Sequence, residues 1–174
     1  MPPATTVPPT TVPPTVPPTT VPPVEVGTLL EELRDAGTYD TLVSIVENSL
    51  PVLPGLLEGF DTFTALAPLD EAFVGKDALV ELLTDPADPD AAAQFVLGLI
   101  EEGRISLASL VTAGSFDSLG VGLYPVVSDG AGQVTIGGAV VVDPDRPASN
   151  GVIQGVSSLP VPTVAATPLP APAP

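Results

Sequence analysis

The sequence predicts an α+β fold, with helices in the first half of the chain and a small sheet formed mainly by the second half. Apolar residues recur at helical spacing between residues 28 and 100, and one strand-like run at 62–67 interrupts them. From about Ser115 onward, short Val-rich segments alternate with turn residues. Because helices and strands are segregated along the chain, we expect the N-terminal helices to pack on a small sheet.

The first helices are predicted by the signals at their ends. Thr28 and Glu31 form a capping box, in which each side chain accepts a hydrogen bond from the other residue's backbone N–H. Gly37 predicts the end of this helix, and a second helix is predicted to begin at Thr38.

The middle of the chain is predicted to hold one strand among short helices. Pro51 and Pro54 are expected to end the first helical region before the strand at 62–67. Asp88 and Pro89 are typical of a helix start, and Gly103 is expected to end the helix that they open. Further short helices are predicted at 70–73, 76–83 and 106–110.

The later strands are predicted at 123–128, 133–136, 139–142 and 152–157. Asp129-Gly130 and Gly137-Gly138 favour hairpin turns, because these residue types tolerate positive φ. Asp143-Pro144-Asp145 is predicted to form a further turn before the last strand.

The prolines divide the chain into three parts. Ten of the 24 prolines lie in residues 2–23 and six in residues 160–174, while all 25 charged residues fall between Glu25 and Arg146. We therefore expect a Pro/Thr-rich spacer at 1–23, one folded domain at 24–160 and a Pro/Ala-rich tail at 161–174.

The N-terminal segment repeats the unit T-T-V-P-P and favours an extended polyproline II spacer. Two alternatives stay open: the threonines carry O-linked sugars, or the repeat docks on a partner, on neighbouring subunits or on further copies of itself. The residues of this interaction tail are Thr5, Val7, Pro8, Pro9, Val12, Pro13, Pro14, Val16, Pro17, Pro18, Val21, Pro22 and Pro23.

Composition excludes several functional classes. The chain has no His and no Cys, so it lacks the usual catalytic triads, redox pairs and disulfides. A net charge of −17 disfavours nucleic acid and anionic lipid as partners. Residues 2–23 lack the basic start and apolar run of a signal peptide, and no stretch predicts a transmembrane helix.

Two segments carry a recognisable pattern. Residues 64–73 read T-A-L-A-P-L-D-E-A-F and residues 150–160 read N-G-V-I-Q-G-V-S-S-L-P. They resemble the two signatures of fasciclin-like (FAS1) domains, T-V-F-A-P-T-N-x-A-F and N-G-V-I-H-x-I-D-x-V-L. The resemblance covers roughly residues 24–162 and implies one domain with helices packed on a β-sheet wedge. The motif residues are Thr64, Ala67, Pro68, Asp70, Phe73, Asn150, Gly151, Val152, Ile153 and Gln154.

Physical roles can be assigned within these motifs. Phe73 is expected to be buried, Asp70 to cap the turn that follows it, and Asn150-Gly151 to form a turn. The chain departs from the family at Gln154, where relatives carry His, and its segment 95–103 has neither the Tyr nor the His linked to adhesion in some members. The fold and a general binding role therefore carry over, and Gln154 keeps the capacity to donate and accept hydrogen bonds.

Together these observations predict a non-enzymatic adhesion or interaction module, exposed outside the cell on its spacer, that binds a protein or carbohydrate surface without a cofactor. The alternative is a structural or decoration subunit of an appendage or virion, whose Pro-rich tails dock on neighbouring subunits. Carboxylates at Asp85, Asp88 and Asp90, and at Asp143 and Asp145, leave a calcium site open beside their simpler interpretation as caps and turns.

Overall fold

The computed structural model describes residues 26–49, 52–59, 61–120 and 122–163. The helices are α1 (Leu29–Ala36), α2 (Asp40–Asn48), α3 (Val52–Glu58), α4 (Asp77–Leu83), α5 (Pro89–Leu97) and α6 (Leu107–Ala113), with a 3₁₀ turn η1 (Asp70–Phe73). The strands are β1 (Phe63–Pro68), β2 (Ile100–Glu102), β3 (Ser115–Asp117), β4 (Leu123–Ser128), β5 (Val134–Ile136), β6 (Ala139–Ala148) and β7 (Gly151–Val156).

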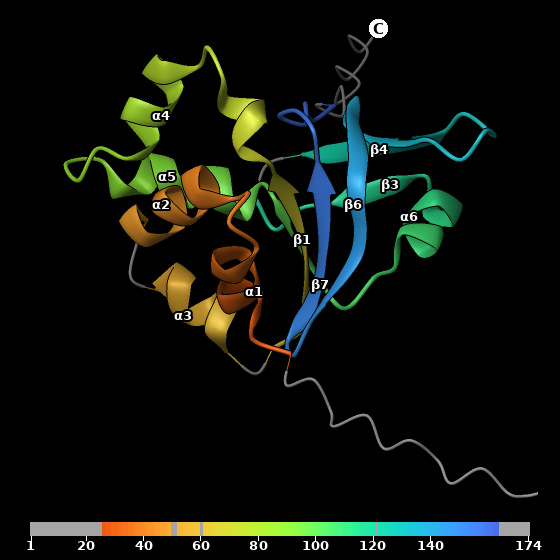
Figure 1. Ribbon diagram of the computed structural model, residues 1–174, viewed down its shortest axis with the longest axis horizontal. Helices are drawn as coiled ribbons and strands as arrows, with labels where there is room; N and C mark the ends of the chain where they lie inside the picture. Colours follow the sequence, from red (N-terminus) through yellow and green to blue (C-terminus); the bar gives the residue numbers. More distant parts are fainter. Residues whose placement is uncertain (1–25, 50–51, 60, 121, 164–174) are drawn as a thin grey trace, which may run out of the picture.

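The helices and the sheet form two halves of the molecule. Helices α1 to α5 lie together on one side of the sheet, at the left of Figure 1, and α6 packs against β3 and β4. The predicted α+β fold is confirmed. Among the described residues, no helix has the length and apolar character that crossing a membrane requires.

The end signals at Thr28, Gly37 and Asp88 are confirmed. The Glu31 carboxylate accepts the Thr28 N–H at 2.8 Å, and the Thr28 hydroxyl accepts the Glu31 N–H at 3.4 Å. Gly37 ends α1 with a φ of 62°, and the Asp88 carboxylate caps α5 by accepting the Ala91 N–H at 3.3 Å. Each of these signals depends only on residues within one turn of the helix end, so the sequence predicts it well.

Two predicted helix ends are wrong. Pro54 does not end the helical region, since it is the third residue of α3, in the first turn, where a backbone N–H has no partner within the helix. Gly103 does not end α5, which stops at Leu97. The chain beyond it forms β2, antiparallel to β1, and the Leu66 N–H donates to the Leu99 carbonyl at 2.7 Å. Pairing with a distant strand has overridden the helical spacing.

The predicted turn at Asp143-Pro144-Asp145 is also wrong, because these residues lie inside β6. The register with β7 shifts twice there, between Val141 and Asp143 and between Asp143 and Arg146. Asp145 has a φ of 53°, so the strand bulges rather than turns. The hairpin at Gly137-Gly138 is confirmed, with φ of 58° and 81°.

The strand order places the first and the last strand of the sheet side by side. The sheet runs β2-β1-β7-β6-β5-β4-β3, and β1 and β7 are parallel neighbours in its interior. Residues that the sequence assigns to the C-terminal tail also contact the sheet: the Val161 N–H donates to the Gly137 carbonyl, and the Thr163 N–H to the Leu123 carbonyl, both at 2.9 Å.

Candidate functional site

The two sequence motifs are adjacent in the structure, because β1 carries the first and β7 the second. Most of their apolar side chains are buried in the core, among them Ala67, Phe73, Val152 and Ile153. Pro68 is also buried, as the last residue of β1.

Thr64 is buried and ties the chain after β2 to β1. Its hydroxyl donates to the Gly103 carbonyl at 2.7 Å and accepts the Ile105 N–H at 2.8 Å. Gly151 lies against the Phe63 carbonyl so closely that a Cβ would overlap it. Both motif residues therefore hold backbone segments together and expose no functional group.

Asn150 joins three elements through one buried amide. Its Oδ1 accepts the Leu29 N–H at the start of α1, at 2.8 Å. Its Nδ2 donates to the carbonyls of Leu57 and Gly59, at the end of α3, at 2.7 and 3.1 Å. The sequence predicts only a turn here, and does not reveal this contact between residues far apart in the chain.

Gln154 is fully buried and stabilises the bulge in β6. Its Oε1 accepts the Asp145 N–H at 3.1 Å, and its Nε2 donates to the Asp145 carboxylate at 2.7 Å and to the Ile105 carbonyl at 3.5 Å. The same carboxylate accepts the Leu107 N–H at the start of α6 at 2.7 Å. The residue that replaces the family's His thus uses both its donor and its acceptor within the fold.

Asp70 caps a different helix from the one that the sequence predicts. The turn η1 has no side-chain cap, and its preceding residue is Leu69. The Asp70 carboxylate instead accepts the N–H groups of Asp40 and Thr41, at the start of α2, at 3.3 and 2.8 Å. The expected cap was wrong because the nearest unsatisfied N–H groups lie on another helix.

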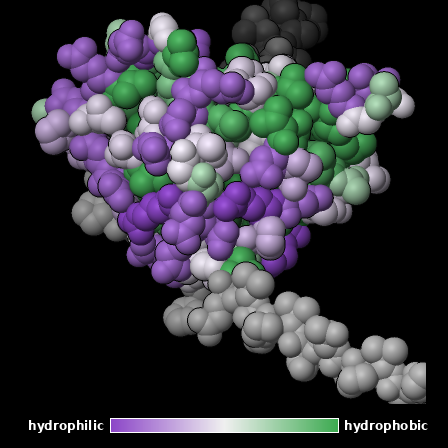
Figure 2. Space-filling view, in the orientation of Figure 1, coloured by the Kyte–Doolittle hydropathy of each residue, from purple (hydrophilic) through white to green (hydrophobic). Residues whose placement is uncertain are grey.

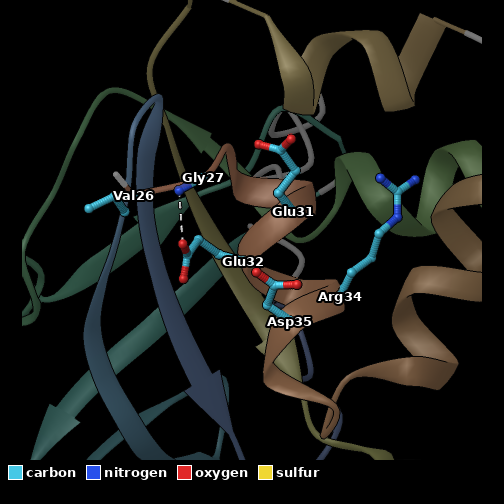
Figure 3. Close-up of a pocket in the computed structure, with 6 residues that line it drawn as sticks. All are labelled: Val26, Gly27, Glu31, Glu32, Arg34 and Asp35. Carbon is cyan, nitrogen blue, oxygen red and sulfur yellow. Dashed lines mark hydrogen bonds between the residues drawn. The ribbon is translucent and has the colours of Figure 1, made fainter. Parts of the chain in front are cut away.

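A shallow hollow opens beside the first turn of α1. Its lining residues are Val26, Gly27, Glu31, Glu32, Arg34 and Asp35. Figure 3 shows Glu32 turned toward Gly27, whose N–H it binds at 2.9 Å. The other oxygen of Glu32 pairs with Arg146 at 3.5 Å. Two carboxylates of this α1 hollow, including Glu31 of the capping box, are therefore engaged within the domain.

The cation of the α1 hollow is engaged as well. Arg34 pairs with Glu47 at 3.0 Å and with Glu58 at 3.3 Å, and in Figure 3 its guanidinium extends away from Glu32. The hydrogen bonds that Arg34 donates to the Glu47 carboxylate raise the pKa of Arg34 above its ordinary value. The α1 hollow is a structural junction of α1, α2 and α3.

A buried tyrosine is linked to this junction through Asp143 and Arg146. Tyr39 donates its hydroxyl to the Asp143 carboxylate at 3.1 Å, and Arg146 lies 3.7 Å from the same carboxylate. A side chain at Gly155 would collide with the Tyr39 hydroxyl, so glycine is required there. Burial, reinforced by the charge of Asp143, raises the pKa of Tyr39 far above its ordinary value, so the phenol stays neutral. The sequence does not reveal this cluster, because Tyr39 and Asp143 are far apart in the chain.

A second hollow, the α2–α4 groove, contains acidic side chains that form no salt bridge with another described residue. It is lined by Thr41, Asp70, Phe73, Val74, Asp77, Val80, Glu81 and Thr84. Asp77 and Glu81 are exposed on α4 and form no salt bridge with another described residue. Phe73 is buried, whereas Val74 beside it is 80% exposed. The groove therefore combines acids with apolar surface.

An apolar face covers β4 to β6 on the outside of the sheet. Val127, Thr135 and Val140 form one cross-strand row of it. Figure 2 shows hydrophobic atoms gathered over these strands, whereas the surface over the helices is mainly hydrophilic. The exposed large apolar residues of β4 and β6 are Leu123, Val127 and Val142.

All but Asp90 of the carboxylates named as calcium candidates have other partners. Asp85 accepts the Ala87 N–H at 2.8 Å, and Asp88 caps α5. Within the described ranges, no group of three or more His, Cys, Asp or Glu residues is placed to hold a metal ion. The interaction tail, from Thr5 to Pro23, lies outside the described residues.

Comparison with known proteins identifies the fold. A family model of the fasciclin domain matches residues 37–162. The protein sll1483 of a Synechocystis strain is 33% identical over 137 residues, which cover 78% of this chain and 73% of that protein. The structure of a FAS1 domain pair from the insect cell adhesion molecule Fasciclin I superposes with a TM-score of 0.67 at 15% identity. That match covers 76% of this chain, and this chain spans half of the insect chain.

Proposed function

The chain belongs to the fasciclin domain family, and from that premise we propose that it is a non-enzymatic adhesion module, displayed outside the cell on its Pro/Thr-rich spacer. Fasciclin domains are commonly adhesion modules that mediate protein interactions, and the family is generally non-enzymatic. The insect relative is itself described as a cell adhesion molecule.

The observation that supports this function best is the apolar face. Val127 is 57% exposed and Val142 is 48% exposed, on a protein with a net charge of −17. An exposed apolar patch of this kind on a soluble domain is typical of a contact surface. The polar residues of the two motifs are committed to the fold, so the face is the better candidate for binding.

The partner of the apolar face is proposed to be a protein. Sugar sites usually present aromatic rings, whereas the exposed large residues of this face are aliphatic. Aliphatic side chains gain free energy mainly by excluding water against another apolar surface. Carbohydrate binding is therefore the less favoured outcome of the test.

The test measures adhesion to cultured cells, immobilised matrix proteins and a glycan array with the full chain. Val127→Ser combined with Val142→Ser should reduce protein or cell binding at least fivefold, because each Val loses about 1 kcal/mol of apolar contact. Leu82→Ser, at an exposed residue of α4 outside the face, is the matched control and should bind normally. Equal loss in both variants, or binding only to glycans, would contradict the proposed partner.

The alternative function is a structural or decoration subunit, in which neighbouring copies cover the apolar face and hold the Pro-rich tails. The same exposed aliphatic residues favour it. Light scattering after size exclusion separates the two proposals. A stable oligomer that dissociates in the Val127→Ser/Val142→Ser variant supports the assembly, and a monomer at high concentration supports the adhesion module.

A further inference from the structure

We propose that the α2–α4 groove is a second docking site, which binds a segment of a partner protein carrying basic side chains next to apolar ones. The groove is a different surface from the apolar face, because it lies among helices α2, η1 and α4 rather than on the sheet. The two proposals therefore succeed or fail separately.

The charges of the groove favour a basic occupant. Asp77 and Glu81 lie four residues apart on α4, where neighbouring side chains of like charge repel each other. No described residue forms a salt bridge with either of them, and only Asp77 is favoured by its place in the first turn of α4. Asp70 adds a third carboxylate at the groove, which is already bound to the start of α2. A Lys or Arg from a partner removes the repulsion and gains two opposite charges.

The apolar part of the groove favours an occupant that carries apolar side chains as well as positive charge. Val74 is 80% exposed, the largest exposed fraction among the large apolar residues that the structure describes. It lies next to the buried Phe73 and shares the groove with the partly buried Val80. A basic side chain covers such a surface with its methylene stem while its charged end reaches the acids. An adjacent apolar residue of the partner would shield Val74 from water.

The spacing of the acids sets the geometry of the occupant. Side chains at i and i+4 of a helix are about 5–6 Å apart. Two basic residues match this distance when they are three or four apart on a partner helix, or two apart on an extended strand. The occupant is thus an amphipathic segment, bound by rim charges and a small apolar contact.

The experiment uses a fluorescent helical peptide of about 14 residues, built of Lys and Leu at amphipathic spacing, and the full chain. Two comparison peptides replace all Lys by Gln, or all Leu by Ser. The wild-type chain should bind the Lys/Leu peptide at least fivefold more tightly than either comparison peptide. Equal binding of the Lys/Ser peptide would show general charge attraction and would overturn the proposal.

Variants of the chain locate the contact. Asp77→Asn combined with Glu81→Gln should weaken peptide binding about tenfold, since two rim charges together contribute roughly 1.4 kcal/mol. Val74→Ser should weaken it about threefold. Asp35→Asn combined with Glu102→Gln changes the net charge equally at exposed acids elsewhere and should change binding less than twofold. Equal weakening by both charge pairs, or unchanged binding in Val74→Ser, overturns the proposal, provided that thermal melts show each variant folded.

Discussion

The α1 hollow and the α2–α4 groove are both lined by acidic residues on helices, yet their charges serve different ends. In the α1 hollow, Glu32 binds the Gly27 N–H and Arg146. In the groove, Asp77 and Glu81 have no described partner of opposite charge. An acid that is engaged within the domain stabilises the fold, whereas one that lacks a partner is available to another molecule. We infer that contacts within the domain, rather than the number of charges, separate the α1 hollow from the proposed docking groove, although Asp35 of the α1 hollow has no salt bridge with another described residue.

The largest expected effect concerns the residue that anchors the α1 side. Asn150→Ala leaves the Leu29 N–H and the carbonyls of Leu57 and Gly59 without their buried partner. We expect the free energy of unfolding to fall by about 3 kcal/mol, measured by urea denaturation. Asn48→Ala, which removes a more exposed amide donating to Leu83 and Asp85, should cost less than half as much. A loss at Asn150 no larger than at Asn48 would contradict the structural role of the second motif.

The contrast between the two hollows can be tested by replacing one acid from each. Glu32→Ala removes the partner of both Gly27 and Arg146 and should lower the free energy of unfolding by about 1–2 kcal/mol. Glu81→Ala should change it by less than about 0.5 kcal/mol, because the carboxylate makes no bond within the domain and Ala favours helices. Similar losses in the two variants, measured by urea unfolding, would remove the distinction between the hollows.

Glu101 is an acid of a third kind, half-buried and only partly satisfied within the domain. Its Oε2 is buried without a hydrogen-bond partner. Burial raises the pKa of Glu101 above the ordinary 4.5, opposed by a backbone hydrogen bond from Asp117 and assisted by the Asp117 charge. With the pKa higher in the folded state, this carboxyl contributes stability below its unfolded pKa, and the contribution is lost as pH rises through the folded pKa.

Glu101→Gln should therefore stabilise the domain at pH 7, by less than about 1 kcal/mol, and flatten its stability profile above pH 4.5. Urea unfolding at several pH values measures both. Glu102→Gln, at the exposed neighbour, is the matched control and should leave the profile unchanged. A loss of stability at pH 7 in the Glu101 variant would show that the carboxylate is a structural anchor like Glu32.

The smallest expected effect concerns the spacer. Deleting residues 2–23 should shift the melting temperature by less than about 2 °C, because the repeat has no core-forming pattern. Differential scanning calorimetry of the full and shortened chains measures the shift. A drop of many degrees would mean that the predicted domain boundary at residue 24 is misplaced.

The sequence predicted those features whose cause is local. The capping box at Thr28, the Asp88 cap and the hairpin at Gly137-Gly138 depend on neighbouring residues, and all three are present. Ile100 fits a helical spacing but forms a strand, because it pairs with Ala65 of β1, which lies 35 residues earlier in the chain.

The same distinction applies to the candidate surfaces. The sequence pattern identified the motif residues but not their partners. Asn150 contacts Leu29, and Tyr39 contacts Asp143, across long intervals of the chain. Gln154 contacts Asp145 only because β6 bulges there. The groove and the apolar face depend on which side chains the fold leaves exposed. Periodicity alone does not determine which side chains stay exposed, because this depends on the register of β4, β5 and β6 in the folded sheet.

The most direct test of the contrast between the two hollows is an NMR titration of the ¹⁵N-labelled chain with the Lys/Leu peptide. We expect the largest amide shifts at Thr41, Val74, Asp77 and Thr84 of the groove, with little change between Gly27 and Asp35 in the α1 hollow. Shifts of equal size at both hollows, or shifts centred on the α1 hollow, would contradict the claim that the α2–α4 groove, rather than the α1 hollow, binds a basic segment.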